Sequence, residues 1–187
     1  KHYDPETKML SIVYKYDEQT HADIIAQFME AANTLLADAS PDKTDVENAK
    51  SIYHALCTRV TYDNSALTEF ERKENYYAYL HNSGVCITFA NVYNQLLTQV
   101  GIQTTLAHCN HPETVGHVWS VVTLDGEQYF CDPTYELSYD SGAGYHFFGM
   151  NYADRTADGL GAKGIWYGRY YSRPMDAEMI AEHSLEN

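Results

Sequence analysis

Three residues of this chain have the side-chain types that build a nucleophilic active site: Cys86, His117 and Asp132. A cysteine attacks as its thiolate, so it needs a base, and an imidazole base needs a third group to fix its tautomer and orientation. The three residues follow one another along the chain as nucleophile, base and orienter. Each one alone is more often structural, since a lone cysteine packs as a small apolar residue and an aspartate before proline often starts a turn. Catalysis therefore depends on whether the fold brings the three together.

Cys86 lies in the first turn of a helix predicted over residues 84–101. Apolar side chains recur along it at helical spacing and predict a buried stripe. Ser83 is the expected N-cap, and Gly101 is of the type that ends helices. A thiol at this position lies at the positive end of the helix dipole, which stabilises the thiolate and lowers its pKa. The backbone N–H of Cys86 is also placed to serve as one oxyanion donor.

The dipeptide Asp125-Gly126 predicts the geometry of the other two residues. Asp-Gly between two β-prone segments is typical of a type I′ hairpin turn. Counting outward from this turn pairs Trp119 with Asp132 and His117 with Thr134. His117 and Asp132 would then be diagonal neighbours on one sheet face, about 7–8 Å apart at the backbone, so that their side chains can meet. We expect the start of the Cys86 helix to dock against that same face.

The rest of the chain predicts helices first and strands later, which favours the α+β class. Expected helices cover residues 21–38, 44–59, 71–81 and 176–183, the second opened by a capping box of Thr44 and Glu47. Expected strands cover residues 9–16, 60–62, 103–109, 116–124, 127–132 and 145–150, with loops over 110–115 and 153–168. We expect a strand and helix extension over residues 1–43 and a catalytic domain over residues 44–187.

The composition limits the possible partners. The chain has 187 residues, 44% of them hydrophobic, which is enough for one domain with a sizeable core. Its formal charge of −14 repels phosphate backbones and argues against nucleic acid as a partner. No apolar run reaches the roughly 18 residues that a membrane span needs. The sequence therefore favours a protein or peptide substrate.

The cysteines form neither a disulfide framework nor a metal site in this interpretation. The four cysteines, Cys57, Cys86, Cys109 and Cys131, contain no CxxC pair, and we expect free thiols. A metal site is the alternative use for the soft ligands His108, Cys109, His111, His117 and Cys131. Their spacing matches no zinc pattern, so we predict no metal and no cofactor.

Three motifs around the candidate residues resemble the signatures of the transglutaminase-like superfamily. They are Gly84-Val85-Cys86, His117-Val118-Trp119 and Asp132-Pro133-Thr134, and the similarity extends over about residues 45–150. The resemblance implies an α+β, papain-like fold with the cysteine at a helix N-terminus packed on an antiparallel sheet. It also implies a triad that acts on amides through a thioester intermediate. Bacterial members with this compact plan are often exported, which implies an exported or cell-surface location.

The chain departs from related patterns at the oxyanion site. Papain-type enzymes carry a glutamine a few residues before the cysteine, and residues 80–83 here contain none. Asn82, Tyr62 and Tyr76 are the candidates for the second oxyanion donor, and Trp119 is the candidate for contact with substrate. No D-x-D-x-D-G loop is present in the sequence, so calcium activation is not implied.

Three functions compete on this basis. Water as the acceptor makes the chain a cysteine peptidase or amidase, which we favour. A lysine amine as the acceptor makes it a protein-glutamine γ-glutamyltransferase that cross-links proteins. A non-catalytic binding module that keeps the fold is the third function, and the presence of all three triad residues argues against it.

Overall fold

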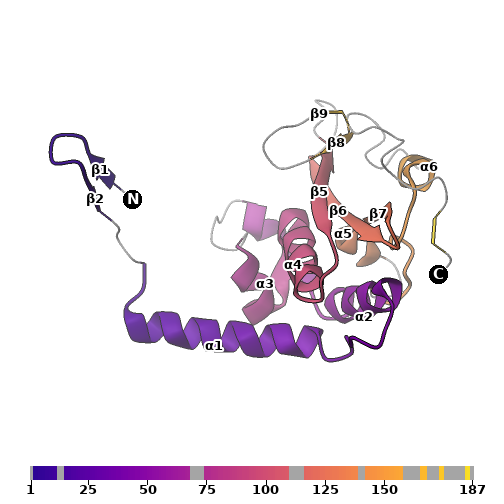
Figure 1. Ribbon diagram of the computed structural model, residues 1–187, viewed down its shortest axis with the longest axis horizontal. Helices are drawn as coiled ribbons and strands as arrows, with labels where there is room; N and C mark the ends of the chain where they lie inside the picture. Colours follow the sequence, from indigo (N-terminus) through magenta and orange to yellow (C-terminus); the bar gives the residue numbers. More distant parts are fainter. Residues whose placement is uncertain are drawn as a thin grey trace.

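The computed structural model describes residues 2–11, 15–67, 74–109, 116–138, 142–157, 165–167, 173–174 and 184–185. The structure combines helices with an antiparallel sheet (Figure 1), which confirms the α+β class. The helices are α1 (Glu18–Leu35), α2 (Asp45–Cys57), α3 (Asn75–His81), α4 (Cys86–Gln99), α5 (Pro133–Glu136) and α6 (Tyr152–Ala157), with a 3-10 turn η1 (Asn64–Leu67). Thr44 and Glu47 form the predicted capping box of α2.

The main sheet has the strand order β7-β6-β5-β8-β9, and every described pair in it is antiparallel. Its strands are β5 (Thr104–Cys109), β6 (His117–Leu124), β7 (Glu127–Cys131), β8 (Ile165–Tyr167) and β9 (Arg173–Pro174). Two small pairs lie outside it. They are the antiparallel β1 (His2–Asp4) and β2 (Met9–Ser11), and the parallel β3 (Thr61–Tyr62) and β4 (Ser83–Gly84).

The turn between β6 and β7 has the predicted type and register. Asp125 and Gly126 have φ values of 53° and 86°, as a type I′ turn requires. Leu124 pairs with Glu127, and the ladder runs back to Ser120 with Cys131. It stops there because Pro133 has no N–H to donate to a ladder and instead opens α5. The predicted pairing of His117 with Thr134 is therefore wrong.

The two faces of β6 belong to different cores. Val122 and Leu124 pack with the apolar side of α4 in the larger core, whereas Trp119 and Val121 join Phe130 in a second, smaller one. Helix α4 thus covers the face opposite Trp119 along its length. Its start contacts His117 through Cys86, as expected, but the rest of the helix does not follow that face. Both faces of β6 are buried, so either face could have received a helix. The apolar side of α4 packs on the face that carries Val122 and Leu124. Cys86 has to meet His117 around the end of the strand.

The ends of α4 are set by backbone contacts. Val85, not Ser83, is the N-cap, and its N–H donates to Thr88 Oγ1 at 3.4 Å. Ser83 is instead committed to β4, which pairs with β3. At the other end Gly101 (φ 85°) follows the predicted pattern, since its N–H and that of Ile102 bond back to the last turn of the helix.

The C-terminal third contains more structure than expected. Helix α6 and strand β8 lie in the segment 153–168, which was predicted to be a loop. The predicted strand over 145–150 is wrong, because Tyr145 and Gly149 have positive φ values and only Met150 forms a bridge, with Phe130. The expectations for residues 12–14, 71–73, 110–115 and 176–183 lie outside the described residues.

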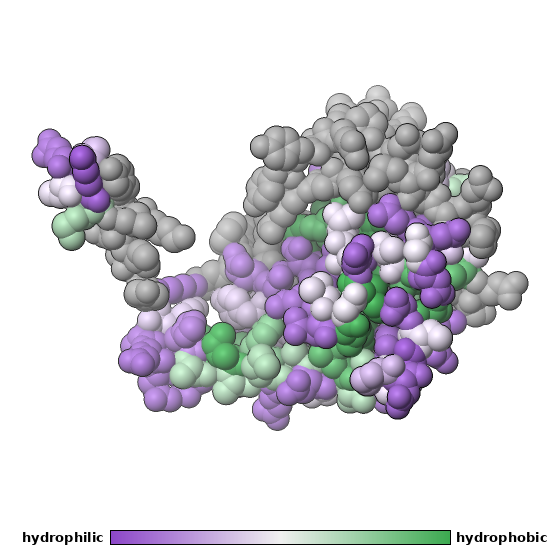
Figure 2. Space-filling model, in the orientation of Figure 1, coloured by the Kyte–Doolittle hydropathy of each residue, from purple (hydrophilic) through white to green (hydrophobic). Residues whose placement is uncertain are grey.

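Helix α1 is buried only in part. Its last turns contribute Ala31, Ala32 and Leu35 to the larger core, whereas Ile25 and Met29 are exposed, and apolar residues are visible along this helix in Figure 2. Among the described residues, none of the helices combines the length and the apolar character that crossing a membrane requires.

Two glycines with the same backbone conformation allow a test of the packing beneath the site. Gly126 (φ 86°) has open space where a Cβ would stand, whereas a Cβ on Gly142 (φ 83°) would lie 2.2 Å from the carbonyl oxygen of Cys57. Gly126→Ala should cost about 1 kcal/mol of unfolding free energy from its left-handed conformation. Gly142→Ala should cost about 3 kcal/mol or more, because overpacking adds to the same strain. Chemical denaturation of both variants measures this, and equal losses would contradict the packing.

Candidate active site

His117 and Asp132 form a buried pair at the end of the sheet. His117 is the first residue of β6, and Asp132 follows directly after β7. The Nε2 atom of His117 lies 2.7 Å from Oδ2 of Asp132, and the two side chains are 9% and 0% exposed. The two residues share a face, as the hairpin register predicts, and this contact places a carboxylate against an imidazole where little water reaches.

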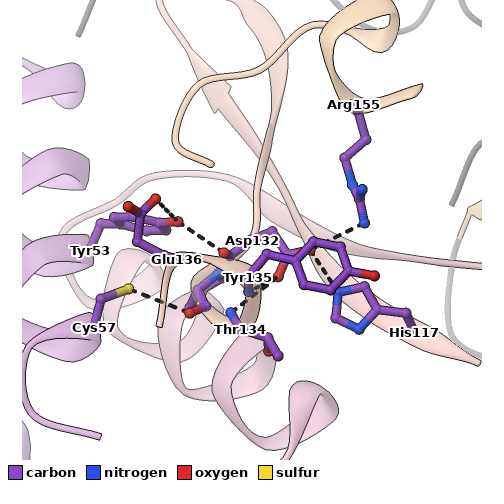
Figure 3. Close-up of polar contacts among 9 residues, drawn as sticks. Tyr53, Cys57, His117, Asp132, Thr134, Tyr135, Glu136 and Arg155 are labelled. Carbon is purple, nitrogen blue, oxygen red and sulfur yellow. Dashed lines mark hydrogen bonds and ion pairs between the residues drawn. The ribbon is translucent and has the colours of Figure 1, made fainter. Parts of the chain in front are cut away.

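Asp132 has a partner for each part of its carboxylate. Oδ1 accepts the backbone N–H groups of Thr134 and Tyr135 at 3.1 and 3.2 Å, which caps α5. Oδ2 faces His117 and also Arg155, whose Nη2 donates at 3.2 Å (Figure 3). Burial raises the pKa of this carboxyl, but His117, Arg155 and the Tyr135 N–H outweigh it and lower the pKa overall. Asp132 is therefore held as a carboxylate.

Cys86 is the first residue of α4 and the only one of the four free cysteines that is not buried. Burial pushes the pKa of its thiol upward, but a hydrogen bond to His117, the charge of that imidazole and the backbone groups of Val118 and Ile87 lower it overall. Because Nε2 of His117 is bound to Asp132, Nδ1 is the ring nitrogen left for the thiol. By contrast, burial raises the pKa of Cys57 and Cys131.

His117 is arranged to carry a positive charge at neutral pH. Burial works against the charge, but Asp132 and Cys86 together raise the pKa of its imidazole to about 9. The ring stacks on Tyr135, with centroids 4.3 Å apart, and lies 5.7 Å from the ring of Trp119. The side chains of Cys86, His117 and Asp132 thus form a row of contacts from thiol through imidazole to carboxylate, which we call the relay.

A buried network supports this relay from below. The hydroxyl of Tyr53 on α2 lies 3.0 Å from the carbonyl oxygen of Asp132 and 3.1 Å from Oε2 of Glu136 (Figure 3). Glu136 accepts the N–H groups of His146 and Phe147 at 3.1 and 2.7 Å. Glu136 itself is fully buried. These contacts fix the chain on both sides of Asp132.

Sequence reasoning missed Arg155, Tyr135 and Glu136. Arg155 lies in the segment that was predicted to be a loop because its composition is rich in Gly, Asp and Ala. Asn151 precedes this helix, and its Oδ1 accepts the N–H of Asp154 at 2.8 Å. An asparagine in this position is a helix-start signal that could have indicated α6. Tyr135 and Glu136 follow an Asp-Pro pair, which is a recognisable helix start.

An open cleft of about 740 Å³ lies beside His117. Residues 57–62 form one wall, and the other comes from Thr134, Tyr135, Leu137 and Ser138. Tyr62 lines the cleft with a side chain that is 40% exposed. Burial raises the pKa of the Tyr62 hydroxyl, and the neighbouring charge of Cys86 raises it further. The hydroxyl is thus close enough to the thiol to interact with it electrostatically. Of the three candidate oxyanion donors, Tyr62 is therefore the one beside the relay.

The other candidates occupy different positions. Asn82 ends α3 in a left-handed conformation, and its Oδ1 accepts from Nε of Arg59. Tyr76 lines a separate cavity of about 660 Å³ between α1, α3 and α4. Trp119 is 0% exposed, so in this structure it lies beneath the cleft and offers no surface to a substrate.

The candidate metal ligands are only partly described. His111 lies outside the described residues, and His108 and Cys109 are adjacent on β5, so they point to opposite faces. Within the described part of the chain, no group of three or more His, Cys, Asp or Glu side chains is arranged to hold a metal ion.

Comparison with known proteins assigns the chain to a family. The family model of the transglutaminase-like superfamily matches residues 32–133. The chain belongs to the transglutaminase-like superfamily. This match includes Cys86 and His117 and ends one residue after Asp132. No curated protein sequence matches the chain significantly.

Three solved structures are similar to this superfamily member. A TGase has a TM-score of 0.47 and 14% identity, covering 69% of this chain and 35% of its own. An arylamine N-acetyltransferase from Bacillus cereus, described with a Cys-His-Glu triad, has a TM-score of 0.44 and 17% identity, covering 58% and 49%. A protein from Cytophaga hutchinsonii assigned as a cysteine protease has a TM-score of 0.46 and 13% identity, covering 71% and 45%. The chain therefore spans about a third to a half of the length of these proteins.

The charge of His117 should depend on Asp132. In the parent protein we expect the imidazole to titrate with a pKa of about 9, so that it is protonated at neutral pH. Asp132→Asn keeps the shape but removes the negative charge, and burial then dominates. The pKa of His117 should fall by about two units or more. NMR titration of the His117 ring measures this in both proteins, and an unchanged pKa in Asp132→Asn would contradict the described pair.

Proposed function

We propose that this chain is a cysteine peptidase or amidase that hydrolyses an amide bond of a protein or peptide through a thioester on Cys86. One observation carries the proposal: His117 lies between a carboxylate that holds its charge and a thiol whose pKa is lowered. A buried ion pair costs solvation free energy, so it persists only where partners and geometry compensate that cost. Perturbed pKa values of this kind are typical of active sites.

The first step uses the thiolate and the imidazolium. The Cys86 thiolate attacks the carbonyl carbon of the bound amide and forms a C–S bond. The developing oxyanion is stabilised by the backbone N–H of Cys86 and by the hydroxyl of Tyr62, which we assign as the second donor. The C–N bond then breaks, and the imidazolium of His117 donates its proton to the departing amine. The products are a free amine and an acyl thioester on Cys86.

The second step regenerates the site. Neutral His117 takes a proton from a water molecule, and the hydroxide oxygen forms a bond to the thioester carbonyl carbon. The C–S bond breaks, the carboxylic acid product leaves, and the thiolate and imidazolium are restored. Asp132 keeps the ring in one orientation throughout and stabilises its positive charge.

The openness of the cleft supports water as the acceptor. Tyr62 is 40% exposed beside the relay, and the cleft of about 740 Å³ opens along His117. A transferase that favours a lysine amine has to limit the access of water, because water is the far more concentrated nucleophile. The cross-linking alternative shares the same thioester and differs only in this second step.

The test is hydrolysis of fluorescent casein by Cys86→Ala beside a matched cysteine variant. Cys86→Ala should lose all detectable cleavage, because no other group can form the thioester. Cys109→Ala removes a buried thiol from the same protein and should retain cleavage. Full cleavage by Cys86→Ala would reject catalysis by this cysteine, whereas the absence of cleavage by the parent protein would favour a binding module.

A labelled primary amine in the same reaction separates hydrolysis from cross-linking. We expect cleavage products and no incorporated amine. Incorporation of the label into glutamine side chains of casein without cleavage would replace the hydrolase by a transglutaminase.

A further inference from the structure

Arg155 is a buried cation that the proposed reaction does not yet use. It lies on α6 and is 1% exposed. Burying a guanidinium is costly unless an anion compensates it. Its described ionic partner is Oδ2 of Asp132 at 3.2 Å, which is the same oxygen that His117 contacts at 2.7 Å. Two cationic side chains thus share one carboxylate oxygen.

The same two aromatic rings hold both cations. The guanidinium carbon of Arg155 lies 4.1 Å from the ring centre of Trp119 and 5.1 Å from that of Tyr135. These rings also flank the imidazole of His117, at 5.7 and 4.3 Å between centroids. Figure 3 shows Arg155 and His117 approaching Asp132 beside the ring of Tyr135. Trp119 therefore supports the relay from below instead of touching substrate.

We propose that Arg155 is a positioning residue of this site, which fixes the Asp132 carboxylate and limits how tightly that carboxylate holds the proton of His117. The proposal rests on the proposed function. Oδ1 of Asp132 is fixed by the cap of α5, and the contact of Oδ2 with Arg155 adds to that with His117 in limiting the remaining rotation of the group. Its positive charge also opposes the imidazolium, which keeps His117 able to release its proton to the departing amine.

Other titratable groups pack around Asp132 and affect the same equilibrium. They are Tyr53 and Cys57 on α2, Cys86 on α4, His117 on β6, Cys131 on β7, and Tyr135 and Glu136 on α5. Among these described groups and Arg155, only Arg155 carries a guanidinium. Its removal should therefore shift the pKa of His117 upward.

The segment that leads into α6 has contacts that do not depend on Arg155. The N–H of Asn151 donates to Oγ of Ser184 at 3.0 Å, and the N–H of Leu185 donates to the carbonyl of Gly149 at 2.9 Å. A neutral residue at position 155 should thus leave the segment in place.

The experiment compares Arg155→Met with Arg155→Lys and the control Lys50→Met. Lys50 also places a cation over an aromatic ring, 4.6 Å from the centre of Tyr145, but has no described contact with Asp132. NMR titration of His117 and the pH profile of Cys86 alkylation by iodoacetamide are measured for each, with thermal unfolding as the check on folding. In Arg155→Met the pKa of His117, and with it the alkaline limb of alkylation, should rise by about one unit.

The conservative variant and casein cleavage complete the test. Arg155→Lys should keep the pKa of His117 close to that of the parent protein, and Lys50→Met should not change it. Casein cleavage should fall about tenfold to a hundredfold in Arg155→Met, because a misplaced acid costs about that much. Arg155→Gln serves as the neutral variant if Arg155→Met does not fold.

Two results would overturn the proposal. One is an unchanged pKa of His117 in a folded neutral variant. Even if that variant were less stable, the result would mean that Arg155 has a purely structural role. The other is an equal rise of this pKa in Arg155→Lys. Failure of the proposed function looks different: Cys86 of the parent protein would then react with iodoacetamide no faster than an ordinary thiol, and casein would stay intact.

Discussion

The structure of the site depends on one buried charge, the carboxylate of Asp132. An ionised carboxylate without water is tolerated only when hydrogen-bond donors and positive charges replace its hydration. Here the N–H groups of α5 satisfy one oxygen, and His117 and Arg155 satisfy the other. The carboxylate that they hold in turn keeps the imidazole in its charged form, and its contact with Nε2 leaves Nδ1 for the thiol. The reactivity proposed for Cys86 therefore follows from how Asp132 is held.

The position of this carboxylate is determined by the junction between β7 and α5. Asp132 lies where β7 ends and Pro133 starts α5, so the strand register and the helix cap orient the same side chain. Cys86 approaches from α4, which packs on the other face of β6, so the thiol and the imidazole meet only at the strand end. In this arrangement His117 lines the cleft, whereas Asp132 is fully buried.

Local signals in the sequence predicted the parts that local interactions determine. Asp125-Gly126 predicted the turn type and the register, because positive φ at both positions leaves few alternatives. Nothing local distinguishes the two faces of β6, since both are buried, and so the face that the body of α4 covers could not be predicted from the sequence. Arg155 was missed for a related reason: a buried arginine is defined by partners far away in sequence, and its own segment looks like a loop.

The most direct test of the account is the alkylation rate of each cysteine at pH 6, measured by mass spectrometry in one sample. Cys57, Cys109 and Cys131 are buried in the same protein and serve as internal references. If His117 holds Cys86 as a thiolate, Cys86 should react with iodoacetamide at least about a hundredfold faster than a free thiol of ordinary pKa, which is almost fully protonated at this pH. A rate for Cys86 no faster than that of an ordinary thiol would contradict the ion pair and the catalysis proposed from it.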